Sequence, residues 1–137
     1  MIRYYSEDCD LPGIDQDIIT DWINRVAVSH GKKAGEINYI FCSDARILEV
    51  NNQYLHHDYY TDIITFDYSE QAKISGDIYI GIETVESNAR MLGLSYESEL
   101  KRVIIHGILH LCGFKDKTPE TEIIMHQKED EALKIHI

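Results

Sequence analysis

The sequence predicts an α+β fold: a small mixed sheet of three to four strands and about five helices that lie mainly on one face. Segments with helical periodicity alternate with short β-rich segments, but without the strict strand–helix–strand rhythm of a nucleotide-binding fold. Two β-rich segments, residues 62–68 and 77–82, are joined by a short polar link, which favours an antiparallel hairpin. One strongly apolar helix carries two histidines, and this predicts a metal site at the end of a helix.

The first half of the chain contains two predicted strands and two predicted helices. The first helix carries an apolar stripe that repeats with the helical period, and Gly31 follows its last turn. Ser43 and Asp44 suit the start of the second helix, because their side-chain oxygens can accept a hydrogen bond from its first turn. The strands are predicted at residues 3–5 and 36–42, and the helices at residues 14–30 and 44–54.

The second half contains the hairpin and three further helices. Ser75 and Gly76 are expected to form a turn before the second hairpin strand. Ser95 is a suitable cap for the histidine-bearing helix, and Pro119 suits the first turn of the last helix. These helices are predicted at residues 83–92, at 95–112 and from residue 118 onward. The last helix is expected to pack through Ile123, Ile124, Met125 and Leu133.

Composition limits the classes of protein to which the chain can belong. Its 137 residues are 44% hydrophobic, which fits a single globular domain over residues 1–137. The first residues lack the features of a signal peptide, and no stretch approaches the roughly 20 apolar residues of a membrane span. We therefore expect a soluble, cytoplasmic protein. The net charge of −11 excludes nucleic-acid binding through the overall field, so a polyanionic substrate requires a local basic patch, a metal or a partner.

The three cysteines do not form a recognisable framework. Cys9, Cys42 and Cys112 are odd in number and far apart, which excludes a disulfide framework and a CxxC zinc knuckle. Cys112 follows His110 by two residues, so on a helix the two side chains face different ways. We expect Cys112 to be a packed thiol rather than a metal ligand.

The strongest functional signal is the segment from His106 to Asp116. His106 and His110 are four residues apart, so they face the same way on a helix. Gly113 can end that helix in a left-handed cap and turn the chain back, which brings the carboxylate of Asp116 toward both imidazoles. Two nitrogens and one oxygen around an open fourth position form a typical catalytic zinc site. The segment therefore predicts one Zn²⁺ per chain, held by His106, His110 and Asp116.

Each part of this segment also has a plainer interpretation. The histidines can be a polar pair packed in the core, and Asp116, between Lys115 and Lys117, can be a solvated turn residue. A zincin-type protease is disfavoured, because Gly107 follows the first histidine where such an enzyme needs a glutamate as general base. The sequence contains no GxxxxGK motif and no GxGxxG motif, so nothing indicates nucleotide binding.

Several segments together resemble the YbeY family of bacterial ribosomal RNA maturation factors. They follow the family's order and spacing over roughly residues 36–133, which makes the resemblance specific. The matching blocks are residues 106–114 (H-G-x-L-H-L-x-G-Y/F), 51–66 (N-x-x-Y-R-x-x-D-x-x-T-D-V-L-S-F), 76–80 (G-D-I-x-I) and 125–129 (M-x-x-x-E).

The resemblance implies a metal-dependent endoribonuclease that acts on ribosomal RNA and ribosomal particles. A water on the metal, rather than a named side chain, is then the expected attacking group. Single-stranded RNA is the expected substrate, because an unstacked strand fits a narrow cleft. Arg102, Lys115 and Lys117 are near the histidines in sequence and are expected either to steer the RNA backbone or to be ordinary solvated charges.

Two positions depart from the family pattern. Asp116 stands where the family usually has a third histidine; a carboxylate can bind zinc, but it lowers the charge of the site and makes bound water less acidic. Leu55 stands where the family commonly has an arginine implicated in activity, and the nearby His56 and His57 are expected to be a polar loop. These departures keep two alternatives open: a non-catalytic zinc-binding ribosome assembly factor, and a metal-dependent hydrolase of another substrate such as a peptide.

Overall fold

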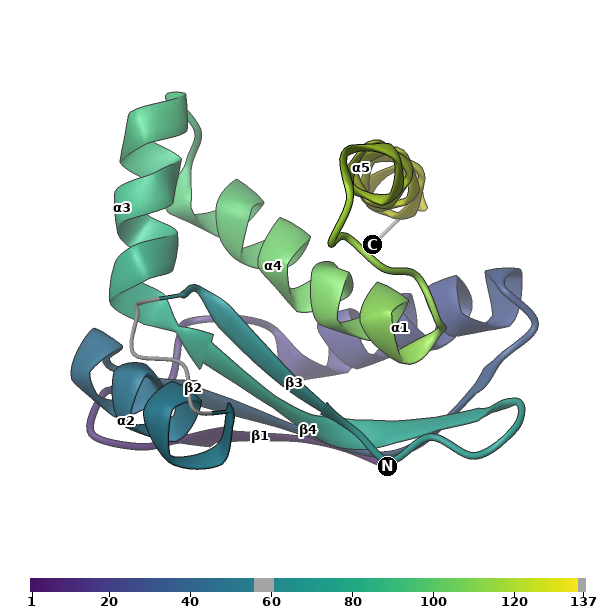
Figure 1. Cartoon of the computed structure of the whole chain (residues 1–137), viewed down its shortest axis with the longest axis horizontal. Coiled ribbons are helices and arrows are strands. Elements are labelled where there is room, and N and C mark those ends of the chain that lie inside the picture. The colour runs from purple at the N-terminus through teal and green to yellow at the C-terminus, as the bar shows by residue number, and fades with distance from the viewer. Residues whose placement is uncertain (56–60, 136–137) are drawn as a thin grey trace.

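The fold was examined in a computed structural model, which describes residues 1–55 and 61–135. These residues form a mixed sheet of four strands with five helices (Figure 1), as the sequence predicts for an α+β protein. The strands are β1 (Ile2–Ser6), β2 (Lys33–Cys42), β3 (Ile63–Asp67) and β4 (Lys73–Gly81), and the helices are α1 (Gln16–Ser29), α2 (Asp44–Leu55), α3 (Ile82–Leu92), α4 (Tyr96–Leu111) and α5 (Pro119–Lys134).

The strands lie in the order β1-β2-β4-β3, with β3 at one edge. β1 and β4 run parallel to β2, whereas β3 and β4 form the predicted antiparallel hairpin. The predicted turn at Ser75 and Gly76 is wrong, because both residues lie within β4. The hairpin turns earlier, where Glu70 and Lys73 exchange two backbone hydrogen bonds of 3.0 Å. Gly76 is needed for a different reason: a Cβ atom there would collide with the carbonyl oxygen of Phe66 on β3.

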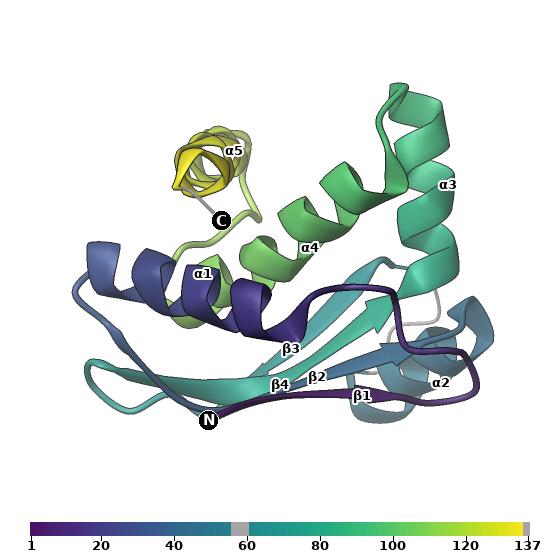
Figure 2. The same ribbon diagram turned by 180° about the vertical axis from the view of Figure 1, so that it is seen from behind.

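The helices cover the two faces of the sheet unequally. α1 and α4 lie across one face, α5 packs on them from outside, and α3 stands at one end (Figures 1 and 2). The opposite face receives only α2, which packs on β3 and β4 through a small separate cluster. That cluster consists of Cys42, Ile47, Val50 and Ile64. The prediction that the helices lie mainly on one face is therefore confirmed, with α2 as the exception.

Two buried side chains fix the helices on the main face. Tyr39 of β2 is fully buried, and its hydroxyl donates a 2.8 Å hydrogen bond to the carbonyl of Ile104 on α4. The indole Nε1 of Trp22 on α1 donates a 2.9 Å bond to the carbonyl of Ala132 on α5. Both bonds satisfy a polar atom inside the main core, so they hold α4 and α5 at defined positions on the sheet.

The last helix packs through part of the predicted set. Met125 is buried and Leu133 packs against the main core, as predicted, whereas Ile123 and Ile124 are exposed by 60% and 44%. Glu129 and Ala132 are also buried on this helix. A buried glutamate in the middle of this face is the first structural sign of a polar site beneath α5. No helix in the described ranges is both long enough and apolar enough to cross a membrane.

Candidate metal centre

The histidine-bearing helix α4 lies unusually close to the hairpin. Ser95 caps it by accepting a 3.1 Å hydrogen bond from the backbone N–H of Ser98, as the sequence predicts. About one turn before its end, Gly107 faces β3 and β4. A Cβ atom there would lie 3.0 Å from Cδ1 of Ile78 and 3.2 Å from Cδ1 of Ile63. Gly107 therefore allows a close approach of the helix to the sheet, which brings His106 and His110 next to β3.

The end of α4 turns the chain back toward the histidines. Gly113 has a φ of 106°, a conformation that favours glycine. The N–H of Gly113 bonds to the carbonyl of His110, and the N–H of Phe114 bonds to the carbonyl of Leu109, both at 3.0 Å. These two bonds form a Schellman motif, which confirms the predicted left-handed cap. The reversal carries Asp116 back over the last turn of the helix.

The three side chains predicted to bind metal converge. Asp116 Oδ2 lies 3.2 Å from Nε2 of His106 and 3.5 Å from Nε2 of His110. One ligand atom from each residue lies within 4.8 Å of the other two, and among the described residues no other such group forms. The side chains are 19% to 33% exposed, so the group is set into the surface rather than packed in the core. This partly exposed position differs from that of a histidine pair packed in the core.

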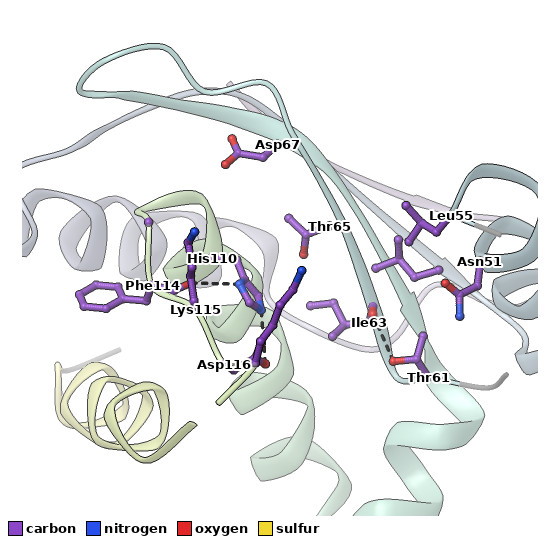
Figure 3. Close-up of a pocket in the computed structure, with 13 residues that line it drawn as sticks. Asn51, Leu55, Thr61, Ile63, Thr65, Asp67, His110, Phe114, Lys115 and Asp116 are labelled. Carbon is purple, nitrogen blue, oxygen red and sulfur yellow. Dashed lines mark hydrogen bonds and ion pairs between the residues drawn. The ribbon is translucent and has the colours of Figure 1, made fainter. Parts of the chain in front are cut away.

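Hydrogen bonds fix the orientation of both imidazole rings. His106 Nδ1 lies 2.5 Å from Oε2 of Glu129. His110 Nδ1 lies 3.1 Å from the carbonyl oxygen of Phe114, as Figure 3 shows. A carboxylate and a carbonyl only accept, so each Nδ1 carries the proton and donates it. The lone pair of each neutral ring then lies on Nε2, the atom that faces Asp116. Histidines that bind metal usually donate their other ring N–H to a carboxylate or a carbonyl in this way.

The distances from the Asp116 carboxylate to the two imidazoles are compatible with a zinc ion. Tetrahedral coordination with bonds of about 2.0–2.2 Å places two ligand atoms roughly 3.3–3.6 Å apart. The two distances from Asp116 Oδ2, 3.2 and 3.5 Å, agree with this geometry. Two nitrogens and one carboxylate oxygen are also a donor set that zinc accepts. The His-His-Asp group could therefore hold a metal ion.

The surrounding charges act differently on the two histidines. Burial opposes a charge on His106, but the hydrogen bond and charge of Glu129 raise its pKa above the ordinary value. Burial and the neighbouring His106 lower the pKa of His110. Burial also opposes a charge on Glu129, yet hydrogen bonds from His106 and Arg102 keep its pKa below the ordinary value. Glu129 is therefore a carboxylate, held in place by a 2.9 Å contact from Arg102.

Comparison with known proteins gives the chain a family. Residues 4–136 match the sequence profile of the family described as Endoribonuclease YbeY. A protein of that name from Parabacteroides distasonis is 58% identical over 98% of this chain and 94% of the relative. Another, from Flavobacterium psychrophilum, is 55% identical over 96% of this chain and 94% of the relative. The chain belongs to the YbeY endoribonuclease family.

A solved structure supports the same assignment for the fold. The solution structure of a protein from Thermotoga maritima is 30% identical and matches 96% of this chain and 89% of that chain, with a TM-score of 0.64. Membership in the YbeY family confirms the resemblance seen in the sequence. It also confirms the prediction of a hydrolytic enzyme of the nuclease class.

The structure gives two side chains contacts that the sequence did not indicate. The guanidinium of Arg102, expected either to steer RNA or to be a solvated charge, contacts Glu129 at 2.9 Å and Asp130 at 2.8 Å. Glu129 supports His106, and the family's closing M-x-x-x-E block was the only sequence signal for it. Its partners lie 23 and 27 residues earlier in the chain, so no local spacing indicates the contact.

Cys112 packs against the core, as predicted for a packed thiol. Burial raises the pKa of this thiol to about 11, so it remains protonated.

Two clefts meet at the His-His-Asp group. The first, of about 560 Å³, runs between β3 and the loop after α4 and contains Lys115 and Lys117 on one wall (Figure 3). The second, of about 520 Å³, lies under α5 and the end of α3. Leu55, 38% exposed, lines the first cleft, whereas His56 and His57 lie outside the described residues. The residues shared by both clefts are Thr61, Ile63, His110 and Asp116.

Proposed function

We propose that this chain is a metal-dependent, single-strand-specific endoribonuclease that matures ribosomal RNA during ribosome biogenesis, with one Zn²⁺ held by His106, His110 and Asp116. The observation that supports it is the convergence of the three ligand atoms with both Nδ1 atoms already bonded elsewhere. A zinc ion held there supplies a Lewis acid for the phosphodiester and makes a water more acidic. We further propose that residues 1–137 act as one domain on ribosomal particles in the cytoplasm.

The side chains of the protein have separate tasks in this proposal. Glu129 and the carbonyl of Phe114 hold the two imidazoles in the tautomer that presents Nε2. Arg102 holds Glu129 in turn and keeps it ionised. Lys115 and Lys117 line the adjacent cleft and make no ion pair with any described residue, so their charges remain available to phosphate oxygens. The attacking group in this proposal is a water rather than a named side chain.

Single-turnover cleavage of a single-stranded ribosomal RNA fragment tests the proposal. Zinc-loaded protein should cut the fragment, whereas chelator-treated protein and His110→Ala should not. Zinc content is measured in parallel, and Asp116→Ala should bind less than one equivalent. Lys33→Ala, on an exposed residue away from both clefts, is the control for handling and contamination. Equal cleavage by all samples would falsify the assignment of the metal centre.

Leu55 supports an alternative function. The position that is commonly arginine in the family is apolar here, in the wall of the first cleft. A zinc-binding ribosome assembly factor without nuclease activity would tolerate this change. That alternative predicts a zinc-dependent melting temperature and co-purification with ribosomal particles, but no RNA cleavage by the pure protein. Measuring cleavage and particle binding on one zinc-loaded sample separates the two functions.

A further inference from the structure

The free edge of β3 forms one wall of the first cleft. β3 ends the strand order, and within the described ranges only β4 pairs with it. Consecutive residues of this strand, Ile63, Ile64 and Thr65, all line the cleft, although their side chains alternate between the two faces of the sheet. The cleft therefore follows the strand edge rather than one face. His110 and Asp116 lie across it from Ile63 and Thr65 (Figure 3).

The hairpin register shows which main-chain groups point into the cleft. Gly81 N–H donates to the carbonyl of Asp62, and Tyr68 N–H donates to the carbonyl of Ser75, both at 2.9 Å. Bonded positions alternate along an antiparallel pair, so Ile64 and Phe66 also bond to β4. The N–H and carbonyl groups of Ile63, Thr65 and Asp67 consequently point outward.

Thr65 is the midpoint of this outward-facing row. The carbonyl of Ile63 accepts a 3.3 Å bond from the Thr61 hydroxyl, whereas the N–H and carbonyl of Thr65 have no partner in the part of the chain that the structure describes. An unpaired donor and acceptor on an extended edge form a template for an extended ligand.

Charge distinguishes the two clefts as binding sites for a polyanion. In the first, Lys115 and Lys117 balance Asp67 and Asp116, so a divalent cation on the His-His-Asp group makes this cleft positive. The second remains negative even with that cation, because one guanidinium faces five acidic side chains. Those groups are Arg102 against Asp62, Glu99, Asp116, Glu122 and Glu129, with three imidazoles, His106, His110 and His126, beside them. A phosphate chain that reaches the metal centre therefore approaches from the β3 side.

We propose that single-stranded RNA lies extended along the free edge of β3, where the N–H and carbonyl of Thr65 hydrogen-bond to a nucleobase edge. Lys115 and Lys117 on the opposite wall contact the phosphates. This inference rests on the proposed endoribonuclease function and adds the direction from which substrate enters. It also gives a physical reason for strand specificity, because base edges that are already paired in a duplex cannot bond to the strand.

Proline at position 65 tests the main-chain contact. Thr65→Pro removes the N–H that faces the cleft but no bond to β4, and proline is tolerated at such edge positions. Thr65→Val removes the hydroxyl and keeps the N–H. Binding of a fluorescent, single-stranded 2′-O-methyl oligonucleotide to zinc-loaded protein is measured by anisotropy. We expect Thr65→Pro to weaken binding by about tenfold and Thr65→Val to leave it within about twofold.

Lysine variants provide an independent test if Thr65→Pro does not fold. Lys115→Gln with Lys117→Gln should lower the slope of log affinity against log salt by about 1.4, that is about 0.7 for each lost phosphate contact. Lys33→Gln with Lys73→Gln, which removes the same charge away from both clefts, should leave the slope unchanged. Equal slopes for the two double variants, or equal affinities for Thr65→Pro and Thr65→Val, would overturn the inference. Displacement of the oligonucleotide by an uncharged extended peptide, with no effect of the lysines, would indicate strand addition by a protein instead.

The outcomes for this inference and for the proposed function are separable. Loss of binding in Thr65→Pro without any RNA cleavage by the unaltered protein refutes the nuclease and retains the binding edge. Cleavage that persists while Thr65→Pro binds normally refutes the edge and retains the nuclease.

Discussion

Glu129 Oε2 lies 2.5 Å from Nδ1 of His106, and this hydrogen bond joins α5 to the candidate metal centre on α4. Glu129 is only 3% exposed, and Arg102 contacts its other oxygen. The carboxylate fixes the ring so that Nε2 faces Asp116, and its charge makes the imidazole a stronger ligand.

Removing the charge of Glu129 should weaken metal binding. Glu129→Gln retains an oxygen that can accept from Nδ1 but loses the negative charge, so zinc affinity should fall by about 10- to 100-fold. Competition with a chromophoric chelator measures the affinity. Asp130→Asn is the matched control, because Asp130 contacts Arg102 at 2.8 Å without contacting His106. An unchanged affinity in Glu129→Gln would show that the contact has no role in metal binding.

Replacing Asp116 by the residue usual in the family should change the pH profile. Asp116→His exchanges an anionic ligand for a neutral one, which leaves more positive charge on the metal and makes its water more acidic. The lower apparent pKa of the pH–rate profile for RNA cleavage should therefore move to lower pH. Asp67→Asn, in the same cleft but outside the converging group, should not move it. A shift of equal size in both variants would assign the effect to general charge.

Gly76 should be indispensable for the hairpin. An added Cβ would collide with the backbone carbonyl of Phe66, which cannot move away without breaking the β3–β4 pairing. We expect Gly76→Ala to lower the free energy of unfolding by about 2 kcal/mol or more, as steric strain in a packed region does. Gly13→Ala is the control, since nothing lies within 4 Å of a Cβ at that position. Urea denaturation of both variants measures the difference, and similar midpoints would contradict the expectation.

The local features of the fold were predictable because they depend on neighbouring residues. Interactions within one or two helical turns determine the cap at Ser95 and the chain reversal at Gly113. The same short range places His106 and His110 on one face of the helix. The approach of Asp116 was predictable for the same reason, since a left-handed cap leaves few directions for the next residues.

Long-range features were not predictable from local patterns. The position of β4 between β2 and β3 depends on pairing between distant segments. Gly76 was predicted to lie in a turn because glycine is common both in turns and where two backbones approach closely, and the sequence alone does not distinguish the two. The ion pairs of Arg102 were not predicted, because its partners Glu129 and Asp130 belong to another helix. A charged residue near a site cannot be given a role until the residues opposite it are known.

Glu99 should make stability depend on pH. Its side chain is 5% exposed, its Oε1 has no hydrogen-bond partner among the described residues, and burial followed by the charge of Asp62 raises its pKa. The folded protein therefore favours the protonated form. That stabilisation is fully present below the pKa of the unfolded state and is lost as pH rises through the higher folded pKa.

Glu99→Gln should remove this pH dependence. The amide stays uncharged, so the variant should be more stable than the unaltered protein at neutral pH by about 1 kcal/mol, with the difference disappearing below pH of about 4. Glu97→Gln, an exposed position on the same helix, should show little change at either pH. Thermal unfolding at both pH values gives the comparison, and a constant difference between Glu99→Gln and the unaltered protein would refute the explanation.

Restoring an arginine at position 55 should strengthen RNA cleavage. Leu55 is partly exposed in the wall of the cleft that contains Lys115 and Lys117, so Leu55→Arg adds a cation on the path proposed for phosphates. A charge-assisted contact to phosphate is worth about 1.5–3 kcal/mol, which corresponds to roughly a 10- to 100-fold rise in kcat/KM. Stability should change by no more than about 0.5 kcal/mol, because the position is near the surface.

Two matched variants identify the cause of any gain. Leu55→Gln tests polarity without charge, and Leu92→Arg adds the same cation to the second cleft, whose other groups are mostly acidic. Single-turnover kinetics on one RNA fragment should rank Leu55→Arg above both. If all three variants behave alike and none cuts RNA, the leucine is not what limits cleavage. The non-catalytic assembly factor then becomes the better account of this chain, because the protein would not cleave RNA even with an arginine at position 55.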